Sequence, residues 1–116
     1  MLPRQNRIKK EKDFEIIFKK GKVFKNNFLV LRFVNNNLKT NRLAIVISQK
    51  VSKKATERNK IRRRISVIVE NIINGLKDGL DLVFLVLPQA NNKSYLEIKS
   101  AVEDIIKKSG LLKNLN

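Results

Sequence analysis

The stretch Asp81-Leu82-Val83-Phe84-Leu85-Val86-Leu87, which runs up to Pro88, decides the fold. A run this apolar lacks the alternation of a half-exposed strand, and it predicts a central strand that is covered on both faces. Pro88 cannot donate a backbone hydrogen bond to a sheet, so we expect the strand to end there. With 116 residues, the chain is long enough to build one compact domain, residues 1–116, around such a strand.

Helices are predicted on both sides of this strand. Before it, four isoleucines recur at spacings of 4, 3 and 4, which places them on one face of a long helix over residues 56–73. They are Ile61, Ile65, Ile68 and Ile72. After it, Ser94-Tyr95-Leu96-Glu97 has the pattern of a capping box and predicts a helix that ends at Gly110. The residues that this helix would bury are Ile98, Val102 and Ile105.

The first part of the chain predicts a short helix and two strands. Asp13 is placed to cap a helix that ends at Gly21. The apolar segments 28–34 and 42–48 predict strands, and Asn35-Asn36-Asn37 between them predicts a turn, so we expect the two strands to pair antiparallel. A further short strand is possible near residues 22–24. The order α-β-β-α-β-α indicates an α/β (α+β) two-layer sandwich on a small mixed sheet, for which a right-handed crossover is the general expectation.

Positive charge is concentrated in one part of the chain. The formal net charge is +16, and residues 1–64 hold 20 Lys and Arg against 4 Asp and Glu, whereas residues 65–116 hold 6 of each. Because a one-sided excess of cations repels itself, the pattern favours a surface that binds a polyanion. The absence of His and Cys excludes imidazole catalysis, thiol nucleophiles and zinc fingers, and we predict no catalytic residue in this chain. The charged first residues predict no secretory segment and no membrane span, and therefore a cytoplasmic protein.

The densest basic segment, residues 50–64, is the first candidate binding site. On a helix, Arg58, Asn59, Arg62 and Arg63 fall within one arc of about 140° beside the isoleucines. A guanidinium donates two parallel hydrogen bonds to phosphate, which suits these residues to nucleic acid. The alternative is an ordinary solvated helix face, on which Lys and Arg pair with acids three or four residues away. The segment has a single acid, Glu57, so such ion pairs cannot account for its many cations.

A second candidate site contains two phenylalanines. Phe14 and Phe18 lie four residues apart, a spacing typical of core residues but also suited to stacking on unpaired bases. Several lysines could line the same groove and hold phosphates without reading sequence. They are Lys9, Lys10, Lys12, Lys19, Lys20, Lys22 and Lys25.

Two stretches resemble a known family. The segment from Ser48 to Arg63, with a basic lead-in, Arg58-Asn59 and then Arg62-Arg63, resembles the signature of the bacterial ribonuclease P protein subunit. The opening of the chain is similar to that of the same family at Asn6-Arg7-Ile8, Asp13-Phe14 and Phe18-Lys19-Lys20-Gly21. The resemblance implies the ribonuclease P protein fold, which is similar to domain 2 of ribosomal protein S5 and has a left-handed crossover between parallel strands.

The resemblance also implies a function. The chain would assist an RNA-based endoribonuclease that removes the 5′ leader from precursor tRNA. The RNA would carry out the cleavage with magnesium, the protein would hold no cofactor, and one protein would bind one RNA. The residues implied for the catalytic RNA are Lys50, Lys53, Lys54, Arg58, Asn59, Lys60, Arg62 and Arg63. Those implied for the leader are Arg7, Phe14, Phe18, Lys19 and Leu31.

Two positions depart from the family pattern, and two other functions remain as alternatives. Ser66 stands where the family usually has another basic residue, and Leu31 stands where an aromatic residue often lines the strand. A ribosomal-type structural protein would bind RNA permanently without assisting any reaction. A polybasic membrane-surface module would instead need a basic helix with exposed large apolar residues.

Overall fold

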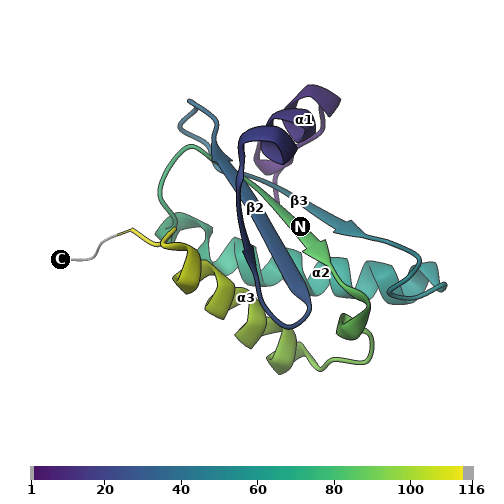
Figure 1. Cartoon of the computed structure of the whole chain (residues 1–116). Coiled ribbons are helices and arrows are strands. Elements are labelled where there is room, and N and C mark those ends of the chain that lie inside the picture. The colour runs from purple at the N-terminus through teal and green to yellow at the C-terminus, as the bar shows by residue number, and fades with distance from the viewer. Residues whose placement is uncertain (1, 114–116) are drawn as a thin grey trace.

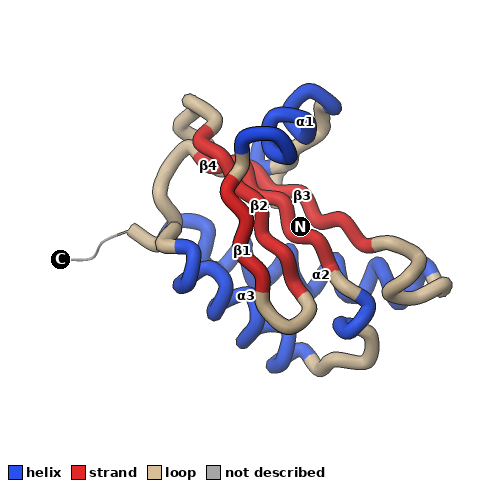
Figure 2. The backbone as a smooth tube through the Cα atoms, viewed as in Figure 1, coloured by secondary structure: helices blue, strands red, loops and turns tan. Residues whose placement is uncertain are grey.

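A four-stranded mixed sheet organises the protein (Figures 1 and 2). The computed structural model describes residues 2–113, and its strands lie in the order β1-β2-β4-β3. Their bounds are β1 (Lys22–Lys25), β2 (Leu29–Asn35), β3 (Arg42–Ile47) and β4 (Leu80–Val86). The prediction that the apolar stretch forms a central strand is confirmed, because β4 is antiparallel to β2 on one side and parallel to β3 on the other.

Helices cover both faces of the sheet, but unequally. The long helices α2 (Ala55–Ile72) and α3 (Tyr95–Ser109) lie against one face, and the shorter α1 (Glu11–Lys20) lies over part of the other (Figure 1). Short 3-10 turns are η1 (Arg4–Asn6), η2 (Ile73–Gly75) and η3 (Pro88–Ala90). The predicted element order is confirmed, with β1 as the additional short strand.

The connection from β3 to β4 is a left-handed crossover. The two strands are parallel, and in Figure 1 the chain passes behind the sheet through α2 as it moves from β3 to β4. Most such connections are right-handed, so the general expectation is wrong here. The hand agrees with the one that the family resemblance implies.

The predicted antiparallel pairing of β2 with β3 is also wrong. β4 lies between them, paired with β2 from Leu29↔Val86 to Asn35↔Leu80. A strand that is apolar on both faces gains most burial in a central position, whereas β3 has more partly exposed positions and lies at the edge. The Asn-rich segment does turn the chain, with Asn37 at φ 60° and the backbone N–H of Asn36 donating to the carbonyl of Gly79 over 2.8 Å.

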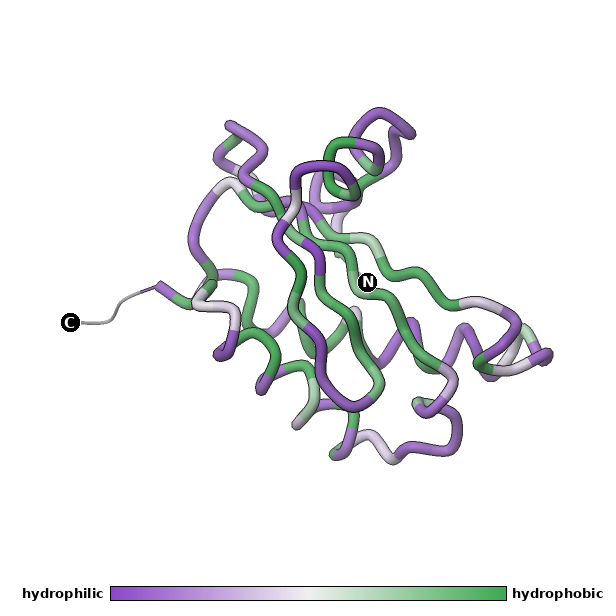
Figure 3. Tube along the Cα trace, in the orientation of Figure 1, coloured by the Kyte–Doolittle hydropathy of each residue, from purple (hydrophilic) through white to green (hydrophobic). Residues whose placement is uncertain are grey.

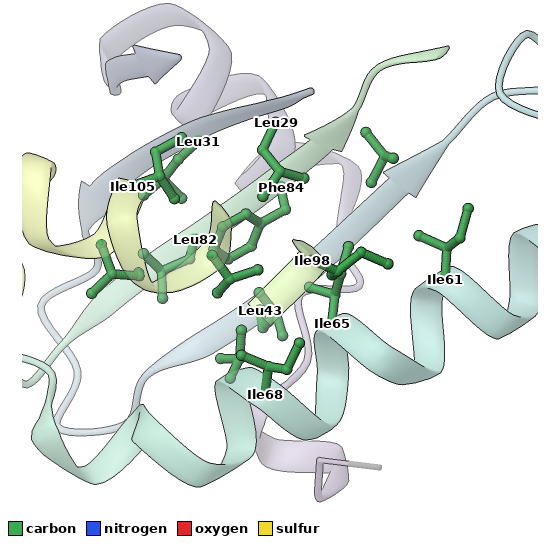
Figure 4. Close-up of a cluster of buried hydrophobic side chains, with 14 of the residues drawn as sticks. Leu29, Leu31, Leu43, Ile61, Ile65, Ile68, Leu82, Phe84, Ile98 and Ile105 are labelled. Carbon is green, nitrogen blue, oxygen red and sulfur yellow. The ribbon is translucent and has the colours of Figure 1, made fainter. Parts of the chain in front are cut away.

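The main core fills the space between the sheet and the helices α2 and α3 (Figure 4). Figure 3 shows that the strands are mostly hydrophobic, while hydrophilic residues predominate in the loops. Three of the four predicted isoleucines are buried, and Ile72 packs partly buried against the same core. A second, smaller cluster under α1 consists of Ile8, Ile17 and Val83.

The helix ends follow the sequence at α3 and depart from it at α1. At α3 the Ser94 hydroxyl accepts from the Glu97 N–H over 3.1 Å, the Glu97 carboxylate accepts from the Ser94 N–H, and Gly110 is left-handed. The prediction that Asp13 caps α1 is wrong, because the helix begins at Glu11 and Asp13 lies in its first turn.

Candidate nucleic-acid interface

The basic start of α2 is anchored to the core through its isoleucines. Ile61, Ile65 and Ile68 are at most 7% exposed. The helix therefore has no free apolar stripe to enter a lipid surface, which argues against the membrane-module alternative. None of the helices described over residues 2–113 is long and apolar enough to cross a membrane.

Hydrogen bonds fix the basic loop to the first turn of α2. The Arg58 guanidinium donates to the Ser52 carbonyl over 2.8 Å, and the Ser52 hydroxyl donates to the Glu57 carboxylate. Glu57 is the only acid in residues 50–64, which hold eight Lys and Arg, so the segment keeps a large positive excess. Lys50, Lys53 and Lys54 are all exposed on or beside this loop.

The side chains along the next turn of α2 differ in their hydrogen-bond partners. The Arg62 guanidinium donates to the Asn59 side-chain oxygen over 2.8 Å, which orients both groups on the outer face. Lys60 and Arg63 are exposed and have no hydrogen-bond partner within the described part of the chain. Arg64 instead reaches the Lys93 carbonyl over 3.3 Å on the other flank, where it ties α2 to the loop before α3. Lys60 lines a cavity with Arg64 on that flank, so it lies apart from Arg62, which lines the cavity at β3.

A cleft opens on the other face of the sheet, between α1 and β3. It encloses about 270 Å³, and Phe14 and Arg7 line it together with Ala44 and Val46 of β3. Arg62 and Ser66 of α2 line the same cavity. The two surfaces that the sequence predicted separately therefore meet at the edge of β3.

The N-terminal segment forms one wall of this cleft. Arg7 bridges Leu43 of β3 in parallel, and its side chain donates to the Leu2 carbonyl over 3.1 Å. Partial loss of hydration, together with the nearby cations Arg4 and Arg7, lowers the pKa of Lys9. The mutual repulsion of these cations is the kind that a bound phosphate would relieve.

The two phenylalanines of α1 have different surroundings. Phe14 is half-buried against the cluster of Ile8, Ile17 and Val83. Phe18 is 44% exposed, and the Arg32 guanidinium carbon lies 5.1 Å from the centre of its ring, within range of a cation–π interaction. Lys19 is exposed next to it.

The assignment of Leu31 to this cleft needs correction. Leu31 is 0% exposed and points to the α3 side of the sheet, where it packs in the main core near Ile105 (Figure 4). Successive residues of a strand point to opposite faces, so its neighbour Arg32 faces α1. Burial alternates along β2, with Leu29, Leu31 and Phe33 buried, and a charged residue among them marks the open face. Arg32 is the only charged residue in this otherwise apolar segment, and that was the sequence signal from which it could have been identified.

Arg32 has a further property that suits a binding residue. Its Nε is buried and has no hydrogen-bond partner within residues 2–113. A buried donor without an acceptor costs free energy that an incoming ligand can recover. No group of three or more His, Cys, Asp or Glu that could hold a metal ion occurs in the same described residues.

Comparison with known proteins identifies the family of the chain. The sequence model of the family described as Ribonuclease P matches residues 2–110. A Clostridium kluyveri protein named Ribonuclease P protein component is 42% identical over 109 residues, covering 92% of this chain and 96% of that one. A Pseudanabaena protein of the same name is 34% identical and covers 97% of each chain.

Solved structures give the same result. The Staphylococcus aureus RNase P protein superposes with a TM-score of 0.86 at 29% identity, covering 93% of this chain and 98% of that one. The Thermotoga maritima RNase P protein, solved in complex with 1-(4-fluorophenyl)-2-thiourea, gives a TM-score of 0.81 at 28% identity, covering 88% and 98%. On its sequence, its fold and the extent of these matches, the chain belongs to the ribonuclease P protein family, the protein component of an RNA-containing endoribonuclease that processes tRNA 5′ ends.

Proposed function

We propose that this protein subunit divides its work between two adjoining surfaces. The start of α2 would bind the catalytic RNA, and the cleft beside α1 would bind the single-stranded 5′ leader of precursor tRNA. The observation that carries the proposal is the shared cavity, because Phe14 and Arg62 line it from opposite sides. A strand held in the cleft would therefore lead directly to the RNA-binding helix.

The α2 surface suits a folded RNA because its cations are fixed in place. The bonds from Arg58 to Ser52 and from Arg62 to Asn59 hold their guanidiniums before any partner arrives. Pre-organised side chains lose less conformational entropy on binding than mobile ones. Lys60 and Arg63 supply further exposed cations for the phosphate backbone.

The cleft suits an unpaired strand of variable sequence. Phe18 of α1 and Arg32 of β2 are not among the residues that line the cavity, but as a contacting pair on the same face of the sheet they offer an aromatic ring and a planar cation, and both groups stack on any base. Lys19 and Arg7 could hold phosphates, which carry no sequence information. The leader-binding set thus becomes Arg7, Phe14, Phe18, Lys19 and Arg32, with Leu31 removed.

The division of labour with the RNA follows from the side chains available. The protein supplies affinity and neutralises phosphate charge, and the RNA with its magnesium ions supplies the chemistry of cleavage. Residues 1–116 would act as one RNA-binding domain in the cytoplasm, with one protein for each catalytic RNA.

Reconstitution tests the proposal directly. The protein is added to a cognate catalytic RNA at low magnesium, and the 5′ cleavage of precursor tRNA is compared with cleavage by the RNA alone. We expect cleavage to be restored, and we expect precursor tRNA to bind more tightly than mature tRNA. Binding of the RNA without stimulated cleavage would favour the ribosomal-type structural role instead. Stimulated cleavage with equal affinity for both tRNAs would remove the leader cleft from the proposal.

A further inference from the structure

An ionic network on the cleft side of the sheet links α1 to β3 and β4. The Arg42 guanidinium donates from Nε and Nη2 to the two carboxylate oxygens of Asp81, over 2.8 Å and 2.7 Å. Its remaining nitrogen, Nη1, lies 3.4 Å from the Asp13 carboxylate of α1. Asn36 adds a hydrogen bond of 2.8 Å to Asp81. One arginine thus contacts carboxylates from two different elements.

The two halves of this network differ in burial. The Asp81 side chain is 4% exposed, and its contacts with Arg42 and the Asn36 amide compensate the cost of burying it. The hydrogen bond to Asp81 raises the pKa of Arg42, with further contributions from the charges of Asp81 and Asp13, and it keeps the guanidinium charged. The Asp13 side chain is 21% exposed, and its pairing with Arg42 therefore lies at the boundary with solvent. Asp81 fixes the arginine, and the arginine in turn holds α1.

Apart from the contact between Phe18 and Arg32 of β2, α1 attaches to the sheet through a small apolar cluster. The only buried residue of α1 is Ile17, which packs with Ile8 and Val83 in a cluster separate from the main core. Phe14, next to Asp13 in sequence, lines the cleft, and Ala44, two residues beyond Arg42 on the same face of β3, lines it from the other side. An ion pair between Asp13 and Arg42 therefore sets the position of one cleft wall relative to the other.

We infer that Arg42 and Asp13 are positioning residues that hold α1 at the distance from β3 at which the cleft accepts a single strand. The inference rests on the proposed leader-binding function of that cleft. Neither side chain needs to touch the leader. Their effect would act through Phe14 and would concern binding of the leader rather than cleavage.

The test uses Asp13→Asn in the reconstituted holoenzyme, with precursor tRNA and mature tRNA as ligands. Removing a carboxylate makes the protein more positive, so simple electrostatics predicts tighter binding of both RNAs. The positioning role predicts the opposite for the leader. The affinity gain of precursor over mature tRNA should fall by about threefold or more, the effect expected for a partly buried ion pair. KM for precursor tRNA should rise, while kcat at saturation and the affinity for the catalytic RNA stay unchanged.

Glu15→Gln is the matched control, because Glu15 is an exposed carboxylate on the same helix and its loss changes the net charge equally. Arg42→Lys is the second variant, since it keeps the charge but loses the two-pronged contact with Asp81. We expect Arg42→Lys to follow Asp13→Asn and Glu15→Gln to behave as the unmodified protein.

Three outcomes separate the hypotheses when Phe14→Ala is measured alongside. The positioning role is overturned if Asp13→Asn matches Glu15→Gln while Phe14→Ala reduces the leader-dependent gain. It is also overturned if Asp13→Asn weakens mature and precursor tRNA equally, because that result indicates a general structural defect. If Phe14→Ala leaves the gain intact as well, the leader-binding function of the cleft fails first.

Discussion

The opposite environments of Leu31 and Arg32 allow a sharp test with two neighbouring substitutions. Leu31 is fully buried in the main core, and truncating a buried leucine to alanine costs about 3 kcal/mol in transfer and cavity terms. The free energy of unfolding of a domain of this size is roughly 6–17 kcal/mol. The Leu31→Ala variant should therefore remain folded but be less stable. If the free energy of unfolding falls by about 1.5 kcal/mol for each M of urea, the urea concentration at the unfolding midpoint should fall by about 2 M.

Arg32→Met should behave in the opposite way. Methionine keeps an unbranched stem near Phe18 and removes the buried Nε that lacks a partner. The free energy of unfolding should therefore stay unchanged or rise by up to about 1 kcal/mol. The leader-dependent gain in affinity should decrease, because the guanidinium is gone.

Urea unfolding followed by far-UV circular dichroism measures the stabilities, and precursor against mature tRNA binding measures the leader contribution. Both assays are made on the same preparations. Binding of tRNA to Leu31→Ala is measured without urea, at a temperature at which circular dichroism shows the variant to be folded. The reasoning is refuted if Leu31→Ala costs less than about 1 kcal/mol and selectively weakens leader binding while Arg32→Met leaves it intact.

Three further predictions concern α2 and α3. Arg62→Ala should weaken binding of the catalytic RNA and reduce the slope of log affinity against log salt by roughly 0.7–0.9; an unchanged slope in a salt titration would remove Arg62 from the interface. Ser94→Ala should lower the free energy of unfolding by about 1 kcal/mol through loss of the capping box, as measured by urea unfolding, with Ser100→Ala in the same helix as the control. Hydrogen bonds from Ser94 lower the pKa of Glu97 below its usual 4.5, so its stabilising effect is present above pH 4.5 and is lost as the pH falls through the lowered value. The free energy of unfolding of Glu97→Gln, measured from pH 4.5 downward, should change less with pH than that of the unmodified protein. An equal change in both proteins would contradict the stabilising role of the Glu97 carboxylate.

Helices and the central strand could be predicted because their signals are local. The isoleucine spacing of α2 and the capping box of α3 each depend on residues within a few turns of one another. The apolar character of β4 likewise reports burial on both faces without reference to its partners. These features account for the element order and for the identity of the main core.

Strand pairing and side-chain facing depended on contacts between distant residues. The segment between β2 and β3 has the composition of a hairpin turn, yet β4, from much later in the chain, separates the two strands. The facing of β2 was missed by one residue, because nearly every position in Leu29–Asn35 is apolar and a shift of one exchanges the faces. Asp13 was predicted as a cap because its ion pair with Arg42, 29 residues away in sequence, leaves no local trace.

The residues of the basic surface could be grouped from the sequence more easily than those of the cleft, for the same reason. The residues of that surface lie within one short segment, 50–63, formed by a loop and the first turns of α2, whereas the cleft joins the N-terminal segment, α1, β3 and α2. That α2 also lines the cleft could not be read from helical periodicity, since it depends on how the β3 edge lies over Arg62 and Ser66.

The central place of β4 has a consequence for how the protein is made. Synthesis delivers β2, β3 and the basic helix before β4, so the sheet on which α2 rests stays incomplete until most of the chain has left the ribosome. Pairings between segments this far apart form slowly, because the loop between them must close first. A nascent chain therefore carries most of its positive charge before it has a surface on which to arrange it. Arrival of β4 joins β2 to β3 and so completes the sheet on which the RNA-binding helix packs.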